Sequence, residues 1–533
     1  MAVDPLFLRG PVIIARARHP ERLLAAVALL AGLAAWIIYL NEGLVLAHYD
    51  AKAHLVVARR VIDSLTPGWR QIGAVWLPLP HLIQILPTQI DVFYRSGAFG
   101  SLLSIACLAV AVWAMSRLVL SMTGSRLGAV ASAALIVVNP NLLYVHVTPM
   151  TEPLLLAATL VSVLLLREWL ITSSGDRVPS SLGWVLFLTT WTRYEAWPIL
   201  AGAIGVAAFA LWRQGRPLAL VVRQTWRLAQ WPAAAVVLFL VLSRLTVGAW
   251  FVSGGFYERD PTYDAQAVKS LLAIWWGTHR LSGYVIEIVG LTAAAWVVWR
   301  AVRNPDESPN LVTVALFAAA ALPAYAFYEA HPFRIRYMVP VVTACALFCG
   351  VAVGALSGRS DQPPLFELRR SAAALAKADR TGPMKSPATA WLLAMLLIAA
   401  TLIESPPWSR SSPLLVEAQL DAANSAARQQ VTACLAPAYH GEKVLASMGS
   451  LAHYMQELSH HGFAIVDFIH EGNGALWELA LETGPAPHAG WMLVEEQSEG
   501  GDVLAQRMRR HNTFTRGMTK VCEGGGVSLY RRD

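Results

Sequence analysis

Eleven apolar runs, separated by short polar loops, constrain the fold of this chain most strongly. They lie at about 23–40, 96–116, 126–147, 152–167, 182–192, 197–212, 232–251, 283–299, 310–328, 337–357 and 388–404. A helix of roughly 20 apolar residues crosses a bilayer, and shorter runs can be accommodated in broken or tilted helices. We therefore expect a mainly α fold, a polytopic transmembrane helical bundle of about 11 spans within residues 1–404.

The composition supports this expectation. Of the 533 residues, 56% are hydrophobic and 14% are charged, and the mean hydropathy is +0.47. Soluble domains carry about 25% charged residues. The net charge of +7 does not indicate nucleic-acid binding, because the basic residues gather in short loops and form no surface interleaved with aromatic residues. Membrane lipids, and no nucleic acid, are the expected surroundings.

The basic residues also predict the orientation. Four arginines precede the first run: Arg9, Arg16, Arg18 and Arg22. The positive-inside rule places this N-terminus in the cytoplasm. The length of the first run, which lacks a clear cleavage site, favours a retained span over a signal peptide. Alternation then places the loop at 41–95 and everything after 404 outside the cytoplasm, with the spans in a bacterial-type inner or plasma membrane.

Residues 405–533, here called the tail, alternate strand-like runs such as AIVDFI and WMLVEE with helical ones such as LAHYMQELSHH. This pattern predicts a small extracytoplasmic soluble α/β domain. Cys434 and Cys522 both fall in the tail, where an oxidising exterior could join them, although sequence alone does not establish their proximity. The tail is rich in histidine, but the spacings match no metal motif.

The external loop at 41–95 begins with HYDAKAH, at positions 48–54. Leu55, Ala58 and Ile62 recur at helical spacing, whereas Lys52 and Arg59 lie on another face. We expect an amphipathic helix along the membrane surface. Aspartate is also a favoured N-cap, so capping this helix is an alternative or additional role for Asp50.

Ionisable residues within or beside apolar runs are costly and are therefore functional candidates. The candidates come from four external loops: Asp50, Lys52 and His54; Glu152; Arg193 and Glu195; and His331, Arg334 and Arg336. Carboxylates and cations on one membrane face suit a group transfer in which an acid deprotonates an acceptor hydroxyl and cations hold a departing phosphate. The planar arginine fork favours Arg334 and Arg336 for the phosphate, with Lys52 as a further candidate.

Structural roles are the alternatives for several candidates. Glu152 stands before a proline at a helix start, where the helix dipole alone favours an acid. Arg193 and Glu195 could pair with each other at the interface. His331 precedes Pro332 in a tight loop, where a structural role is the more common one.

The same residues resemble the GT-C superfamily of lipid-linked sugar transferases. This group contains protein O-mannosyltransferases, bacterial aminoarabinose transferases and the oligosaccharyltransferase catalytic subunit. The resemblance covers about residues 20–357 and rests on HYDAKAH in the first external loop, MTEP after the third run, TRYEAW, and RYMVP at the start of a late span. It implies that Asp50 is the general base, that Glu152 shapes an acceptor or metal site, and that Arg334 and Arg336 lie near the donor phosphate.

One departure from the family pattern is informative. Asp50 stands between Tyr49 and Ala51 and is not part of a paired-acid motif, which argues against the O-mannosyltransferase subfamily and a protein serine or threonine acceptor. The expected activity is that of an inverting membrane glycosyltransferase using a polyprenyl-phosphate sugar, with a glycan, lipid or protein acceptor. No cofactor is specified, no metal ligand is assigned, and a divalent metal stays open.

Two other functions are compatible with the composition. A secondary transporter or lipid flippase would place its polar residues near the bilayer midplane and often shows internal repeats, whereas here the candidates cluster at one face. A non-catalytic membrane scaffold could display the tail as a binding module.

Overall fold

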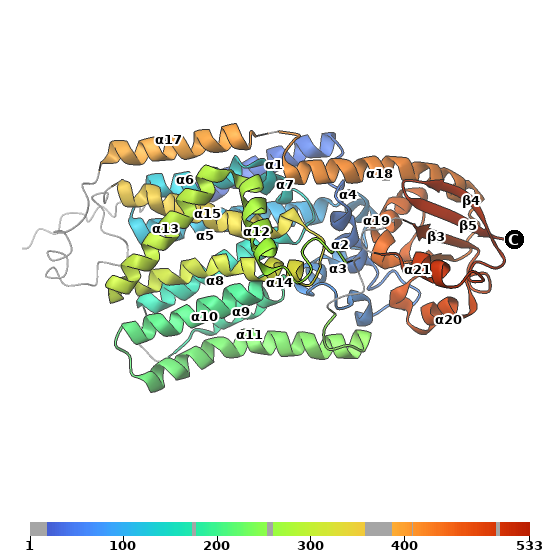
Figure 1. Cartoon of the computed structure of the whole chain (residues 1–533), viewed down its shortest axis with the longest axis horizontal. Helices are drawn as coiled ribbons and strands as arrows, with labels where there is room; N and C mark the ends of the chain where they lie inside the picture. Colours follow the sequence, from blue (N-terminus) through green and yellow to red (C-terminus); the bar gives the residue numbers. More distant parts are fainter. Residues whose placement is uncertain (1–18, 173–176, 253–258, 358–385, 408, 497–500) are drawn as a thin grey trace, which may run out of the picture.

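The computed structural model describes residues 19–172, 177–252, 259–357, 386–407, 409–496 and 501–533. Figure 1 shows a helical bundle at one end of the long axis and the sheet of the tail at the other, with the loop at 41–95 between them. The fold is thus a polytopic helical bundle with a C-terminal α/β domain, as the sequence predicts.

Nine helical segments within the described residues are long and apolar enough to cross a membrane. They are α1 (Pro20–Asn41), α5 (Ala98–Thr123), α8 (Glu152–Thr172), α10 (Ala196–Arg213), α11 (Leu218–Val247), α13 (Tyr284–Arg303), η2 (Pro305–Ala320) with α14 (Ala321–Tyr328), η3 (Ile335–Met338) with α15 (Val339–Leu356), and α17 (Pro387–Glu404). Two shorter apolar helices are α6 (Arg126–Val137) and α9 (Ser180–Thr190). Each of the eleven apolar runs therefore contains a helix, but two of these helices are too short for a simple span.

Helix α15 lies at the centre of the bundle and is buried over most of its length. It packs closely on α6, where a Cβ placed on Gly128 would lie 2.5 Å from the backbone oxygen of Gly350. Small residues at such contacts let the backbones of membrane helices approach each other. The position of α15 fixes the position of η3, the short segment at its start that carries Arg336.

Shorter helices connect the spans. They are α2 (Tyr49–Arg59), η1 (Trp69–Ile72), α3 (Leu79–Thr88), α4 (Asp91–Ser96), α7 (Pro140–Val145) and α12 (Ala267–Ser282). Every residue of α2 from Asp50 to Ala58 is buried. The helix packs on α3 and on α19 of the tail, so it is enclosed and does not lie along a membrane surface. The expectation of an amphipathic helix along the membrane surface is wrong, because the tail covers the face of α2 that would otherwise meet solvent.

The tail contains a five-stranded sheet in the order β2-β1-β3-β5-β4. Its strands are β1 (Val444–Ala446), β2 (Phe468–Ile469), β3 (Trp491–Glu495), β4 (Met518–Gly524) and β5 (Val527–Arg532). The pairs β1–β2 and β1–β3 are parallel, whereas β3–β5 and β4–β5 are antiparallel. The helices are α18 (Pro413–Leu435), α19 (Met448–Leu458), α20 (Ala475–Thr483) and α21 (Val503–Arg510), with short turns η5 (Ala436–Ala438), η6 (Ser459–His461), η7 (Ile465–Asp467) and η8 (Glu471–Asn473).

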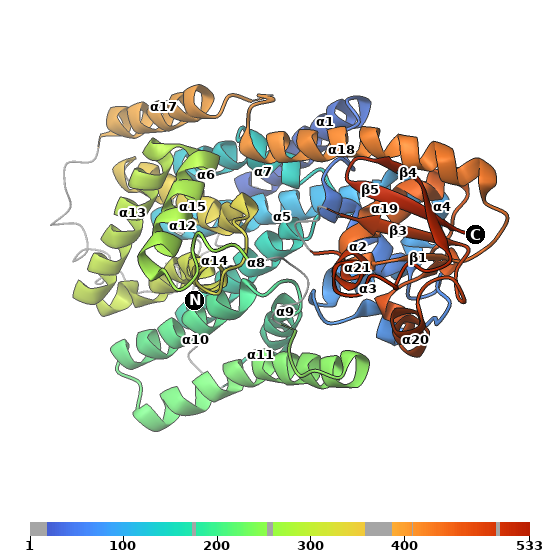
Figure 2. The same cartoon turned by 45° about the vertical axis from the view of Figure 1, so that its right-hand side comes forward.

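The loop at 41–95 and the tail share one hydrophobic core. Leu55 and Val56 of α2 belong to the same buried apolar cluster as Leu451 of α19 and Phe468 of β2. Figure 2 shows α2 and α3 close to α19 and the sheet, while α18 runs from the bundle to the far side of the tail. Burial of large apolar side chains is the main stabilising term in such a core, so the loop and the tail stabilise each other.

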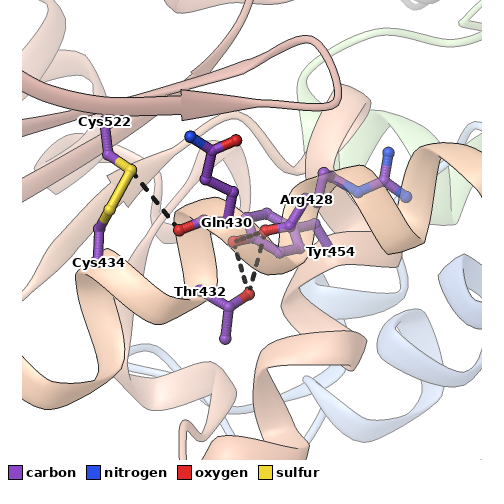
Figure 3. The surroundings of a disulfide bond; sticks show 6 residues. All are labelled: Arg428, Gln430, Thr432, Cys434, Tyr454 and Cys522. Carbon is purple, nitrogen blue, oxygen red and sulfur yellow. Dashed lines mark hydrogen bonds between the residues drawn. A yellow bond between two sulfur atoms is a disulfide. The ribbon is translucent and has the colours of Figure 1, made fainter.

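A disulfide joins Cys434 at the end of α18 to Cys522 in β4, across 88 residues of sequence (Figure 3). Nearby, the hydroxyl oxygens of Thr432 and Tyr454 lie 2.9 Å apart and connect α18 to α19. The cysteine pairing that the sequence left open is therefore present. Structural disulfides are typical of oxidising compartments.

Candidate active site

The site begins at the N-terminus of α2, which His48 caps. The backbone N–H of Asp50 donates to Nδ1 of His48 at 3.2 Å, and the N–H of Tyr49 donates to a carboxylate oxygen of Asp421 at 2.9 Å. A side-chain acceptor at the N-cap satisfies an N–H that the helix cannot pair internally. The interpretation of Asp50 as the N-cap is therefore wrong; Asp50 lies in the first turn, where its carboxylate takes another partner.

That partner is Arg336 from η3. Its Nη2 forms an ion pair with Asp50, and its Nη1 lies 3.0 Å from Nε2 of His48. Asp50 and Arg336 are each only 5% exposed. Removing two charges from water is costly, and close pairing of this kind is what makes it possible.

The charges continue through the turns that carry Glu152 and Arg193. Oε1 of Glu152, at the start of α8, lies 3.6 Å from Nε of Arg336 and 3.1 Å from Nη1 of Arg193. Nη2 of Arg193 lies 2.8 Å from Oε1 of Glu195. Acids and arginines thus alternate in one buried row, Asp50–Arg336–Glu152–Arg193–Glu195, which we call the charge row. The structure brings these five predicted residues together, and Glu152, at 1% exposure, is its most buried member.

Electrostatics keep Asp50 ionised. Burial raises the pKa of Asp50, but Arg336, followed by His54 and His48, outweighs burial and lowers the pKa to about 2. Burial lowers the pKa of Arg193, and the charges of Glu152 and Glu195 outweigh it and raise that pKa above its ordinary value. The row therefore presents a carboxylate beside a fixed guanidinium at neutral pH.

Two further candidates lie at the edge of the charge row. The guanidinium of Arg334 lies 5.8 Å from the ring centre of Tyr49, as does that of Arg336. Nδ1 of His331 lies 2.8 Å from the carbonyl oxygen of Pro332, and its Nε2 lies 3.4 Å from the hydroxyl of Tyr337. The carbonyl contact gives His331 a structural role in its loop, while Arg334 adds a second cation next to Tyr49.

Lys52 lies elsewhere. Its Nζ is 2.6 Å from Oε1 of Glu457 and 2.9 Å from the hydroxyl of Ser425, and Arg428 binds the same glutamate at 3.1 Å. These contacts tie α2 to α18 and α19 of the tail. The assignment of Lys52 to the donor phosphate stays a prediction, and the geometry gives this lysine a different partner. A cavity of about 370 Å³ opens beside it, lined also by Arg95, Gln456 and His460.

His54 is buried one helical turn after Asp50, with 1% exposure. Its Nδ1 lies 3.0 Å from Nε2 of His81 in α3, and its ring packs against Trp76. His54 therefore borders the charge row, with a second histidine behind it.

Sequence reasoning missed the contribution of the tail. Oε2 of Glu417 in α18 lies 3.7 Å from Nε2 of His48, and Asp421, one turn later, accepts the Tyr49 N–H. Burial raises the pKa of Glu417, but His48 and Arg336 outweigh it and lower the pKa to about 2. The available signal was the spacing of Glu417, Asp421 and Ser425, which places three polar groups along one face of a helix.

The described part of the chain contains no group of three or more His, Cys, Asp or Glu side chains arranged to hold a metal ion. Arg336 lies between Asp50 and Glu152, so a protein cation already supplies positive charge between these two acids.

No protein-family model matches the chain, and no curated protein matches it. Among solved structures, the crystal structure of the Archaeoglobus fulgidus oligosaccharyltransferase in the apo form is similar over 90% of this chain and 70% of that chain. The sequence identity is 12% and the TM-score is 0.48. This is a likeness of overall architecture, and the roles of individual residues rest on the geometry of this chain.

Proposed function

We propose that this chain is an integral membrane glycosyltransferase that moves a sugar from a polyprenyl-phosphate donor to an acceptor hydroxyl at the extracytoplasmic face. The observation that carries the proposal is the charge row, in which an ionised Asp50 is paired with Arg336 at one end of an apolar helical bundle. A base and an anion-binding cation in direct contact are the two groups that this reaction needs.

The proposed reaction is a single displacement. The acceptor oxygen attacks the anomeric carbon while Asp50 takes the hydroxyl proton. The bond between that carbon and the phosphate oxygen breaks, and its electron pair leaves with the phosphate. Arg336 and Arg334 stabilise the negative charge that develops there. One displacement inverts the anomeric configuration, by the same stereochemical reasoning that applies to inverting glycosidases.

The pairing of Asp50 with Arg336 suggests an order of events. In the structure the guanidinium of Arg336 is shared by Asp50 and Glu152. A donor phosphate that binds Arg336 competes with Asp50 for the same N–H groups, so donor binding frees a carboxylate oxygen for the acceptor hydroxyl. Glu152 and Glu195 keep Arg193 and Arg336 in place during this exchange, which makes them positioning residues.

Asp50→Asn is the direct test, because it keeps the shape of the side chain and removes its basicity. We expect transfer from radiolabelled polyprenyl-phosphate sugars by the purified protein in nanodiscs to fall by about 10³-fold, within the usual range for loss of a general base. Asp91→Asn, in the same loop but exposed and paired with Arg59 and Arg95, is the matched control and should keep its activity. Full activity of folded Asp50→Asn would overturn the proposal.

A further inference from the structure

His54 and His81 form a buried pair beside the charge row. His54 follows Asp50 by four residues in α2, and residues four apart lie on the same face of a helix. The exposure of His54 is 1% and that of His81 is 0%. Trp76 packs against both rings, at 4.4 Å from the centre of His54 and 5.8 Å from that of His81. The pair is thus enclosed on the face of α2 that carries Asp50.

The hydrogen bonds determine where the protons lie. Nδ1 of His81 is 3.3 Å from the carbonyl oxygen of Leu77, which can only accept, so His81 carries its proton on Nδ1. Nε2 of His81 is then an acceptor, and the contact of 3.0 Å requires Nδ1–H of His54 to donate to it. A neutral imidazole has one N–H, so Nε2 of His54 presents a lone pair.

This lone pair is buried and has no hydrogen-bond partner within the described ranges. Buried polar atoms are normally paired, so such an exception calls for an explanation. Burial lowers the pKa of His54 well below its ordinary value, and His81, Arg193 and Arg336 add to this effect while Asp50 opposes it. Burial, together with Arg60, lowers the pKa of His81 to about 3. Both rings therefore stay neutral near pH 7, and the acceptor is permanent.

These constraints define which chemical groups can interact with Nε2 of His54. A lone pair accepts a hydrogen bond, so an ionised phosphate, which offers only acceptor oxygens, does not fit. The two positive charges of Arg193 and Arg336 near His54 outnumber the one negative charge of Asp50. This net positive surrounding disfavours a divalent cation at Nε2 of His54. A neutral hydroxyl or amide N–H fits both requirements, and sugars are rich in hydroxyl groups.

We propose that His54, oriented by His81, accepts a hydrogen bond through Nε2 from a hydroxyl or amide group of the sugar or acceptor bound beside Asp50. This inference rests on the proposed function and adds a second substrate contact to the same face of α2. His54 binds substrate in this scheme, whereas His81 is a positioning residue that fixes the tautomer of His54.

The tautomer can be tested without turnover. The full chain, labelled with ¹⁵N-histidine in nanodiscs, should show a protonated Nδ1 and an unprotonated Nε2 for both residues, unchanged from about pH 8 to about pH 5, because neither ring approaches the ordinary titration range. His54→Gln and His81→Gln assign the signals. A proton on Nε2 of His54, or a shift of that signal on addition of Mg²⁺ or Mn²⁺, would overturn the inference, the latter in favour of a metal ligand.

Kinetics test the substrate contact. Glutamine at position 54 retains an acceptor oxygen near the place of Nε2, whereas leucine does not. We expect His54→Leu to raise KM about 3- to 10-fold relative to His54→Gln, with a smaller change in kcat, as for loss of one neutral hydrogen bond. His81→Leu should act in the same direction and His81→Gln should rescue it, while His511→Leu, at an exposed position of the tail, serves as the control.

Failure of the His54 inference can be distinguished from failure of the proposed glycosyltransferase function. Equal KM values for the glutamine and leucine variants at position 54, with Asp50→Asn inactive, would overturn this inference alone. An active Asp50→Asn would overturn the proposed function, whereas the tautomer measurement gives its result in either case.

Discussion

At the scale of single residues, Arg336 is the central member of the charge row. Its guanidinium contacts Asp50 and lies near Glu152, so one side chain neutralises two acids from loops that are about 100 residues apart in sequence. Removing one partner of a buried ion pair leaves an uncompensated charge and costs about 3–5 kcal/mol. Arginine suits this position because its planar fork holds two partners at once, which the ammonium of lysine does not reproduce.

Arg336→Lys should therefore retain a folded protein with greatly reduced transfer. The positive charge is kept, but the bidentate geometry toward the acids and the donor phosphate is lost. We expect kcat/KM to fall roughly 100-fold, the order seen when one electrostatic donor is removed from an active site. Donor binding and turnover, measured separately, check this result. Wild-type kcat/KM in Arg336→Lys would contradict a role for the arginine fork.

The acid side of the pH–rate profile is a second test at this scale. The pKa of Asp50 is lowered to about 2, below the ordinary value of 3.8, so the base stays ionised throughout the working range. In the free enzyme Asp50 is paired with Arg336, so kcat/KM should show no decline attributable to Asp50 between about pH 8 and pH 5. Because the folded-state pKa is depressed, its contribution to stability is present above about pH 4 and is lost as the pH falls toward 2. An acid limb with an apparent pKa near 6 that disappears in Asp50→Asn would contradict this assignment.

At the scale of elements, the sequence predicted the spans well and the first loop only in part. The apolar runs contain their own signal, since a helix in lipid must satisfy its backbone internally. The burial of α2 depends on partners more than 300 residues away, such as Asp421 for Tyr49 and Glu457 for Lys52. Local periodicity does not encode such contacts. The position of Asp50 in the sequence was enough to make it a candidate, whereas the helix cap at His48 and the contribution of the tail could not be predicted.

We expect the ion pair between Lys52 and Glu457 to stabilise α2 against local unfolding. Burial raises the pKa of Glu457, but Lys52 and Arg428 outweigh it and lower the pKa to about 2. Glu457→Gln leaves the buried Lys52 and Arg428 without their carboxylate and should destabilise α2 locally by about 3–5 kcal/mol. Lys52→Met leaves Glu457 paired with Arg428 and should destabilise α2 by less. Hydrogen exchange of residues 49–59 measures the loss.

The double variant Lys52→Met with Glu457→Gln provides the control for this prediction. Removing both charges should restore part of the protection that Glu457→Gln loses, because Lys52 no longer lies unpaired and Arg428 keeps its contact with Ser425. Equal exchange in wild type and in both single variants would show that the tail does not hold α2 through this pair.

At the scale of the whole molecule, the tail and the bundle act as one unit. Asp63 in the first loop accepts the backbone N–H groups of Ile465 and Val466 at 3.1 and 2.9 Å, and α2 shares the core of the tail. The tail therefore positions the helix that carries the proposed base. We propose that the face on which they meet is extracytoplasmic, in agreement with the disulfide and with the positive loops at the other end of the spans.

The proposed orientation predicts a labelling pattern. The described free cysteines, Cys107, Cys345 and Cys349, are buried, and Cys434 and Cys522 are oxidised. A membrane-impermeant maleimide applied to intact cells should therefore label Ala426→Cys in α18 but not Arg303→Cys at the end of α13. Both positions are exposed, and permeabilisation should make both react. If the impermeant reagent labelled only Arg303→Cys in intact cells, the protein would have the opposite orientation in the membrane, and the proposed orientation would be wrong.

The roles proposed for Asp50, Arg336 and Arg334 can be tested directly by a cryo-electron microscopy map of the full chain in nanodiscs with a bound polyprenyl-phosphate sugar. We expect the phosphate to lie within hydrogen-bond distance of Arg336 and Arg334. We also expect that Asp50 has left Arg336 and faces the anomeric carbon. A phosphate bound elsewhere, with the ion pair between Asp50 and Arg336 intact, would contradict the proposed roles of both residues.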